Sequence, residues 1–136
     1  MAQRKSIAWI LEFVSKLSEE EQVKCLQAND VEPIRIILQY CFHPAAVWAL
    51  PEGTPPYKAC EYPNIENMLY GEARKMHIFL EGSSNVSQLK REKMFLDLLE
   101  SITPEDAKLL VSIKEKKLPF EGLKPETIQK AYPGIF

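Results

Sequence analysis

The distribution of proline constrains this chain more than any other feature. Four of its ten prolines fall between Leu50 and Pro63, in a stretch that begins Leu50-Pro51-Glu52-Gly53-Thr54-Pro55-Pro56-Tyr57. Such a segment is stiff and extended rather than helical. A loop of about 14 residues is uncommon in a compact domain and often functional. We therefore predict a proline-rich loop over 50–63, which either binds a ligand or crosses the core as a strap packed by Trp48 and Tyr57.

The rest of the chain follows helical periodicity. Ile7, Leu11 and Val14 repeat at intervals of four and three residues, which places them on one face of a helix. Similar patterns recur along the chain, and no stretch alternates apolar and polar residues for long enough to predict a strand. The expected helices cover about residues 4–17, 19–28, 33–42, 64–81, 88–101 and 104–117, with a last short helix near 125–131.

Helix-start signals support these boundaries. Ser18 stands three residues before Glu21, which is the spacing of a capping box. Ser87 is placed to cap the helix that follows it, and Thr103 followed by Pro104 is a strong helix start. The patterns together predict an all-α fold. We expect a single compact domain, residues 1–136, of about six short-to-medium helices, with the proline-rich loop before the longest helix.

Composition bounds the class of protein. The net charge of −2 gives no global basicity that would point to nucleic acid. Cys25, Cys41 and Cys60 form no C-x-x-C pair, and we expect free thiols in a reducing compartment. No apolar run approaches the roughly 20 residues that span a bilayer. The first apolar stretch is interrupted by Glu12 and Lys16, so it does not predict a signal peptide. We expect a cytosolic protein without a membrane segment.

The sequence contains acid–base and metal-ligating residues, but not in the arrangements that are typical of catalytic or metal sites. Glu66, Glu72 and His77 offer acid–base groups, yet no nucleophile motif accompanies them. The five glycines form neither a P-loop nor a dinucleotide-binding turn. The residues that could bind a soft metal lie at no spacing typical of zinc sites: Cys41, His43, Cys60 and His77. We therefore predict no metal, no cofactor and no catalytic residues, and a non-enzymatic protein that acts by binding.

Aromatic residues interleaved with cations mark the predicted ligand site. Rings can stack on a ligand while cations pair with its charge, and the proline-rich loop and the helix after it carry both kinds of side chain. The alternative is that the tyrosines only border the core. The predicted ligand-binding residues are Tyr57, Lys58, Tyr62, Tyr70, Arg74 and His77.

A second set of cations offers an alternative function. If these side chains gather into one patch, they would bind the phosphates of a nucleic acid. Otherwise they are solvated charges at helix ends. The set consists of Lys90, Arg91, Lys93, Lys114, Lys116 and Lys117.

Five short motifs suggest an origin for the chain. They are Leu50-Pro51-Glu52-Gly53-Thr54-Pro55-Pro56-Tyr57, Glu72-Ala73-Arg74-Lys75, Arg91-Glu92-Lys93-Met94-Phe95, Lys114-Glu115-Lys116-Lys117-Leu118 and Ala131-Tyr132-Pro133. As a set they resemble a domain family encoded by T-even-type tailed phages, notably those of marine cyanobacteria. The likeness spans about Leu11 to Ile135. The family has no assigned activity, so no functional residue carries over.

This resemblance implies a phage accessory protein. The expected role is host takeover or counter-defence, by sequestering a host protein or a small signalling nucleotide in the cytoplasm of the infected bacterial host. Two alternatives remain. One is a nucleic-acid-binding accessory factor of phage replication or transcription, and the other is a minor structural component of the virion.

Large apolar side chains predict self-association. A core of six helices does not easily hide all of them, and large apolar patches rarely stay exposed on monomers. Two-fold dimers are the commonest solution. We therefore expect a homodimer with the first helix and the aromatic loop near the interface. The side chains are Trp9, Phe13, Trp48, Tyr70 and Phe136.

Overall fold

The structure is a computed structural model that describes residues 5–82 and 84–136. Within those residues every regular element is a helix, and the one β pairing is an isolated antiparallel bridge between Trp48 and Leu80. The predicted all-α fold is confirmed. The elements are α1 (Ile7–Ser15), α2 (Glu19–Ala28), α3 (Glu32–Phe42), α4 (Met68–Glu72), the 3-10 helix η1 (Ala73–Phe79), α5 (Gln88–Leu99), α6 (Pro104–Lys114) and α7 (Pro125–Ala131).

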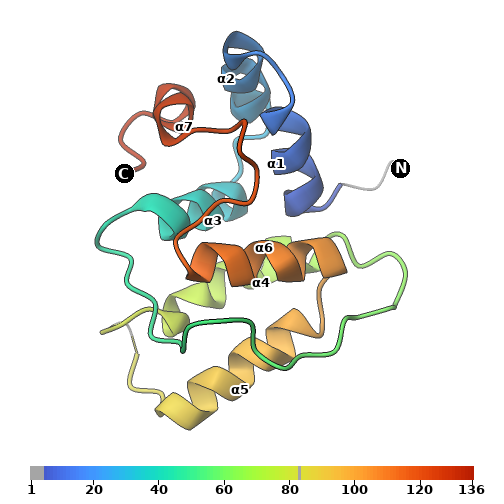
Figure 1. The fold of residues 1–136 in the computed structure, drawn as a ribbon, viewed down its shortest axis with the longest axis vertical. Coiled ribbons are helices and arrows are strands. Elements are labelled where there is room, and N and C mark those ends of the chain that lie inside the picture. Colours follow the sequence, from blue (N-terminus) through green and yellow to red (C-terminus); the bar gives the residue numbers. More distant parts are fainter. Residues whose placement is uncertain (1–4, 83) are drawn as a thin grey trace.

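Helix α6 lies at the centre of the arrangement (Figure 1). It packs against α1 and α3 on one side and against α5 on the other. Helices α2 and α7 pair at the end of the molecule away from α5. No helix in the described part of the chain is long and apolar enough to span a bilayer.

Local capping explains where the helices begin. The side chains of Ser18, Ser87 and Thr103 each accept a hydrogen bond from the backbone amide three residues later, as predicted. Ser6 does the same for α1. Each such bond satisfies one amide that has no partner within the helix.

The predicted long helix over 64–81 is wrong in its extent. The structure forms only the five-residue α4 and the seven-residue η1, and α5, with 12 residues, is the longest helix. Asn64 adopts a left-handed conformation with φ of 60°, which no helix continues. At the other end, the Ala49 amide donates to the Phe79 carbonyl (2.7 Å) and the Glu81 amide to the Val47 carbonyl (2.8 Å). This pairing with the distant segment at 47–49 replaces helical hydrogen bonds.

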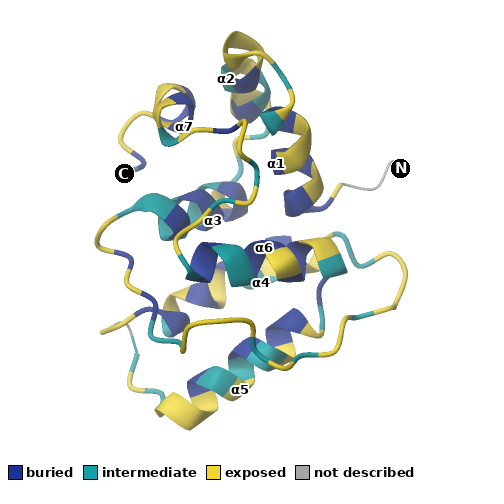
Figure 2. Cartoon of the chain, viewed as in Figure 1, coloured by how far each residue is buried: buried dark blue, intermediate teal, exposed yellow. Residues whose placement is uncertain are grey.

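An aromatic cluster joins the start of the proline-rich loop to the core. The Trp48 ring stacks on Phe79 with centroids 6.4 Å apart, and Phe95 meets both rings edge-on. The Trp48 indole nitrogen donates to the Tyr40 carbonyl (3.0 Å). Trp48 is therefore the anchor of the loop, which then runs largely exposed or half-buried over α5 and α6 (Figure 2).

Candidate functional site

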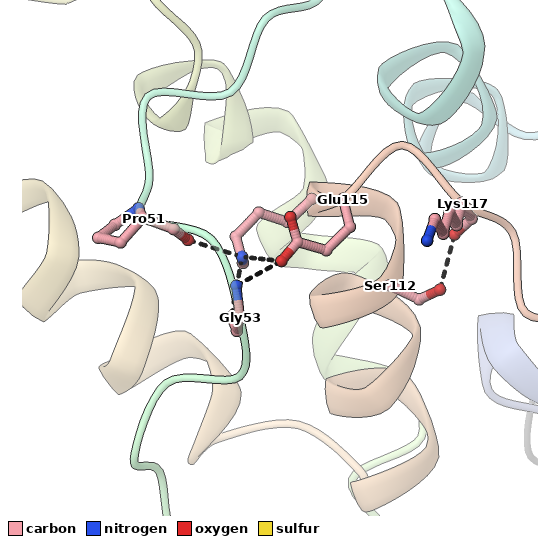
Figure 3. Close-up of polar contacts among 6 residues, drawn as sticks. Pro51, Gly53, Ser112, Glu115 and Lys117 are labelled. Atoms are coloured by element: carbon pink, nitrogen blue, oxygen red, sulfur yellow. Dashed lines mark hydrogen bonds and ion pairs between the residues drawn. The ribbon is translucent and has the colours of Figure 1, made fainter.

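A buried lysine holds the start of the proline-rich loop against α6. The Lys114 side chain is 2% exposed. Its ammonium group donates to the carbonyl oxygens of Pro51 (2.8 Å) and Gly53 (3.0 Å) and to Oε1 of Glu115 (3.2 Å). These three acceptors use all three of its donors. The Glu115 carboxylate also accepts a hydrogen bond from the Gly53 amide (Figure 3). We call these four residues the Lys114 clamp.

The clamp depends on a glycine at the turn. Gly53 has φ of 88°, a conformation that residues with a Cβ rarely adopt, and its amide and carbonyl both face the clamp. The hydrogen bond from the Gly53 amide, followed by the hydrogen bond and the charge of Lys114, holds the pKa of Glu115 below its ordinary value. The carboxylate therefore stays charged beside the buried cation.

Two further hydrogen bonds fix the loop on the α5 side. The Gln88 side-chain amide donates to the Ala49 carbonyl (2.8 Å), and the Lys58 backbone amide donates to Glu100 (2.8 Å). The segment 49–58 is thus held near both ends and, through the Lys114 clamp, in the middle. It forms a strap over α5 and α6, and two hollows lie along it.

The first hollow lies between the strap and α5, and we call it the α5 cavity. Its volume is 270 Å³. Its walls are mostly apolar, and the one cation that lines it, Lys114, has already used its donors. The cavity therefore fits a small apolar group. It is lined by residues 50–56 together with Glu92, Phe95, Leu96 and Lys114.

The second hollow lies between the strap and α6, and we call it the α6 groove. Its volume is 320 Å³, and it is lined by Gly53, Thr54, Tyr57, Lys108, Val111, Ser112, Glu115 and Lys117. Lys108, Ser112 and Glu115 follow one another at intervals of four and three residues, which puts them on one face of α6. This groove combines an aromatic ring with two exposed lysines.

The predicted ligand-binding residues do not converge on one hollow. Of the six, only Tyr57 lines the α6 groove, while Lys58 and Tyr62 line a separate hollow of 410 Å³ beside Glu100. Tyr70 is buried, and its hydroxyl donates to the Lys5 carbonyl (2.7 Å).

Arg74 and His77 lie on the exposed side of η1. Arg74 forms an ion pair with Glu32 (3.2 Å), and the His77 ring nitrogen Nδ1 lies 3.0 Å from the Arg74 carbonyl. Neither residue lines the α5 cavity, the α6 groove or the hollow beside Glu100.

Three of the six cations predicted to contact nucleic acid bind backbone carbonyls instead. Lys114 belongs to the clamp. Arg91 is buried and donates to the carbonyls of Ile78 (2.9 Å) and Val86 (3.2 Å). The Lys116 ammonium donates to the carbonyls of Tyr40, His43 and Ala46 at the end of α3. Each of these cations joins segments that are distant in the chain or caps a turn.

The other three predicted cations are exposed. Lys93 pairs with Asp97 (3.2 Å), and Lys117 lines the α6 groove. Lys90 lies in the first turn of α5. The structure therefore does not gather the six cations into one free patch.

Sequence reasoning missed Lys108 and Ser112 as site residues. Their spacing with Glu115 marks a polar face of α6, but this pattern is also that of any solvated helix face. Only the strap across that face makes it a groove.

Among the described residues, the cysteines and histidines do not form a metal site. No group of three or more His, Cys, Asp or Glu side chains in the described residues is arranged to hold a metal ion. Cys25, Cys41 and Cys60 are free, as predicted. Burial raises the pKa of the Cys41 thiol to about 12, so this thiol is unreactive at neutral pH.

Comparison with known proteins places the chain in a family. No curated protein and no solved structure matches it. The model of a family of unknown function (DUF6433) matches residues 10–119, a range that contains the strap, α5, α6 and every residue of the two hollows, while α7 lies beyond it. The chain therefore belongs to the DUF6433 family, a family without an assigned function.

Proposed function

We propose that this protein is a non-enzymatic accessory protein of a T-even-type phage. It acts by binding in the cytoplasm of the infected host, in host takeover or counter-defence, and it sequesters a host protein or a small signalling nucleotide. The phage origin rests on the set of five motifs, which lie in the loop, at the junction of α4 and η1, in α5, at the end of α6 and at the end of α7. The binding role rests on one observation, the strap that the Lys114 clamp holds over two hollows.

A strap of this kind favours binding because its conformation is set before a ligand arrives. Prolines restrict the loop, and the clamp and the bonds to Ala49 and Lys58 restrict it further. A preorganised surface loses less conformational entropy on association. The two hollows are also close to the smallest volumes typical of ligand sites, roughly 300 Å³.

A comparison of two tyrosines in the same loop tests the proposal. Tyr57 lines the α6 groove, whereas Tyr62 is 78% exposed and lies outside it. Tagged wild-type protein, Tyr57→Leu and Tyr62→Leu would each be recovered from infected cells. Bound proteins would be identified by mass spectrometry, and so would the small molecules released by denaturation.

The expected result is a partner or small molecule that the wild type and Tyr62→Leu retain and Tyr57→Leu loses. If the wild type releases no specific protein and no small molecule, the proposal fails.

The nucleic-acid alternative is weaker because Arg91, Lys114 and Lys116 already bind carbonyls. A gel shift at low salt tests it, because binding through phosphates weakens as salt rises. The virion alternative is tested by whether the protein is present in purified particles.

We also propose that the protein is a homodimer through α1. Trp9 and Phe13 are 45% and 46% exposed, and their rings stack with centroids 5.3 Å apart. Pairing of two antiparallel α1 helices about a two-fold axis would place Trp9 of one copy against Phe13 of the other. Trp48 and Tyr70, which were expected not to fit in the core, are buried in it, and Phe136 is half-buried against Phe42. The proposed interface therefore rests on Trp9 and Phe13.

A further inference from the structure

We propose that the α6 groove is the ligand site, and that it takes a small molecule with an aromatic ring and several negative charges, of the class of nucleoside triphosphates. This inference rests on the proposed binding function and names the ligand chemistry for it. Three properties of the groove carry it: its exposed cations, the spacing between them and its aromatic wall.

The two exposed lysines of the groove are free to bind an anion. Neither the Lys108 nor the Lys117 ammonium group forms an ion pair or hydrogen bond with another described residue. Glu115 is the one carboxylate among the described residues that line the groove; it is paired with Lys114, and the charge of Lys117 also helps to lower its pKa. The charge that the groove presents to a ligand is therefore positive.

The lysines enter the groove from separated backbone positions. Lys108 lies in the second turn of α6, and Lys117 follows the helix end. The helix rises by about 1.5 Å per residue from Lys108 to its end, and the Lys117 amide then turns back to the Ser112 carbonyl (3.1 Å), so the two backbone positions are on the order of 10 Å apart. Two cations at this spacing can each pair with a separate negative charge, such as neighbouring phosphates of one polyphosphate chain or two anionic groups of one ligand.

The strap supplies the aromatic wall. The Tyr57 side chain lines the groove and is half-buried, and its hydroxyl has no hydrogen-bond partner in the described part of the chain. A ring held in this way offers a face for stacking at little entropic cost. On the opposite wall the Ser112 hydroxyl donates to the Lys117 carbonyl (2.7 Å), which leaves its lone pairs to accept a hydrogen bond from a base.

A small molecule fits these observations better than a nucleic-acid strand. A strand needs a continuous track of cations. Arg91, Lys114 and Lys116 are occupied by carbonyls, and neither Lys90 nor Lys93 lines the groove. Within the groove, the exposed cations are therefore only two, Lys108 and Lys117, which is too few for a track along a strand.

Calorimetric titration of the purified full-length chain tests the inference. The probes are ATP, GTP, CTP and UTP, with adenosine and inorganic tripolyphosphate as the two halves of ATP. We expect saturable binding of at least one triphosphate with one site per chain, and weaker binding of either half. The Lys108→Gln/Lys117→Gln double variant should weaken that binding by at least about tenfold. Tyr57→Leu, which keeps an apolar contact with the core, should weaken it by about tenfold.

Lys90→Gln is the matched control, because Lys90 is an exposed lysine outside the groove. It should bind the triphosphate as the wild type does. Thermal melting checks that each variant is folded, and if Tyr57→Leu is not, the double lysine variant decides.

Three results would overturn the inference: no saturable binding of any triphosphate, equal weakening by Lys90→Gln and the double lysine variant, or tighter binding of a ten-residue thymidine oligonucleotide than of every triphosphate. If none of the triphosphates binds while infected cells still yield a protein partner that Tyr57→Leu loses, this inference fails and the proposed function stands.

Discussion

The ammonium group of Lys114 donates to the carbonyl oxygen of Pro51 across 2.8 Å, and so joins the end of α6 to a residue 63 positions earlier in the chain. This contact positions the strap, which forms one wall of the α5 cavity and one wall of the α6 groove. Its strength therefore bears on stability and on any binding at the strap.

Replacing Lys114 by Met should lower the free energy of unfolding by about 1–3 kcal/mol, because the hydrogen bonds from its ammonium group to two carbonyls and to the Glu115 carboxylate are lost. Urea denaturation followed by circular dichroism measures the change. Lys117→Met is the control, and since Lys117 is exposed we expect a change within about 0.5 kcal/mol. A wild-type urea midpoint for Lys114→Met would mean that the clamp does not stabilise the fold.

Lys116 performs two separable tasks. Its backbone is left-handed, with φ of 61°, and its ammonium group caps α3 through three carbonyls. Both Lys116→Ala and Lys116→Gly lose the cap, but only Ala keeps the strained conformation. We therefore expect Ala to be less stable than Gly by about 1 kcal/mol, and both to be less stable than the wild type. Thermal or urea unfolding of the three proteins gives the order, and an Ala variant more stable than Gly would contradict it.

Two glycines should respond to alanine in opposite directions. A Cβ at Gly122 would lie 2.1 Å from the Ser15 carbonyl oxygen, whereas a Cβ at Gly71, inside α4, meets nothing within 4 Å. Gly122→Ala should cost about 1–3 kcal/mol because the two segments must move apart. Gly71→Ala should stabilise the protein by about 0.5–1 kcal/mol, because alanine favours a helix. Equal urea midpoints for the two variants would contradict this close approach.

Asp106 should make stability depend on pH. Its side chain is fully buried, Oδ1 accepts from the Ala8 amide (2.8 Å), and Oδ2 has no partner in the described residues. Burial is the main cause that raises its pKa from 3.8 to about 6, while the Ala8 amide opposes the rise and the charges of Glu105 and Glu66 add to it. The folded state therefore binds this proton more tightly than the unfolded state.

The stabilisation from Asp106 is thus fully present below pH 4 and is lost as pH rises through about 6. Its full size is on the order of 3 kcal/mol. Asp106→Asn keeps an acceptor for the Ala8 amide but does not titrate. We expect the wild type to gain stability relative to Asp106→Asn between pH 7 and pH 4.5, measured by urea unfolding. A difference that stays constant with pH would show that Asp106 does not titrate in this range.

The exposed stack of Trp9 and Phe13 predicts a homodimer. Each ring is nearly half exposed, and burying such a side chain stabilises an interface by roughly 1.5–3 kcal/mol. Light scattering coupled to size exclusion should give about twice the chain mass of 15.6 kDa at tens of micromolar protein, and the Trp9→Glu/Phe13→Glu variant should elute as a monomer. A wild-type mass of one chain would rule out this dimer under those conditions.

Local sequence was enough to predict the helix class and most helix starts. A cap such as Ser18 bonds to an amide three residues away, and the apolar face of α1 repeats within its own turns. Interactions of this range depend only on neighbouring residues, so they are readable without the fold. The match to a family of unknown function over residues 10–119 likewise depends on the sequence alone.

Tertiary contacts decided what local patterns left open. The region 64–81 has helical periodicity, yet Leu80 pairs with Trp48 instead. Lys114 and Lys116 follow the rule for cations at a helix end, but each is bound to carbonyls more than 60 positions away. The sequence places Asp106 among the acids in the first turn of a helix, but in the structure its carboxylate accepts a hydrogen bond from the Ala8 amide of another helix.

The candidate site also combines a residue that the sequence predicted with a residue that only the tertiary structure identified. Tyr57 was predicted as a binding residue, and Lys108 was not, because the groove between them exists only where the strap crosses α6. The sequence determines which side chains are aromatic, charged or helical. Whether a charge remains free for a ligand depends on which carbonyls the folded chain brings to it, since a buried cation takes the nearest acceptors to offset its loss of solvation.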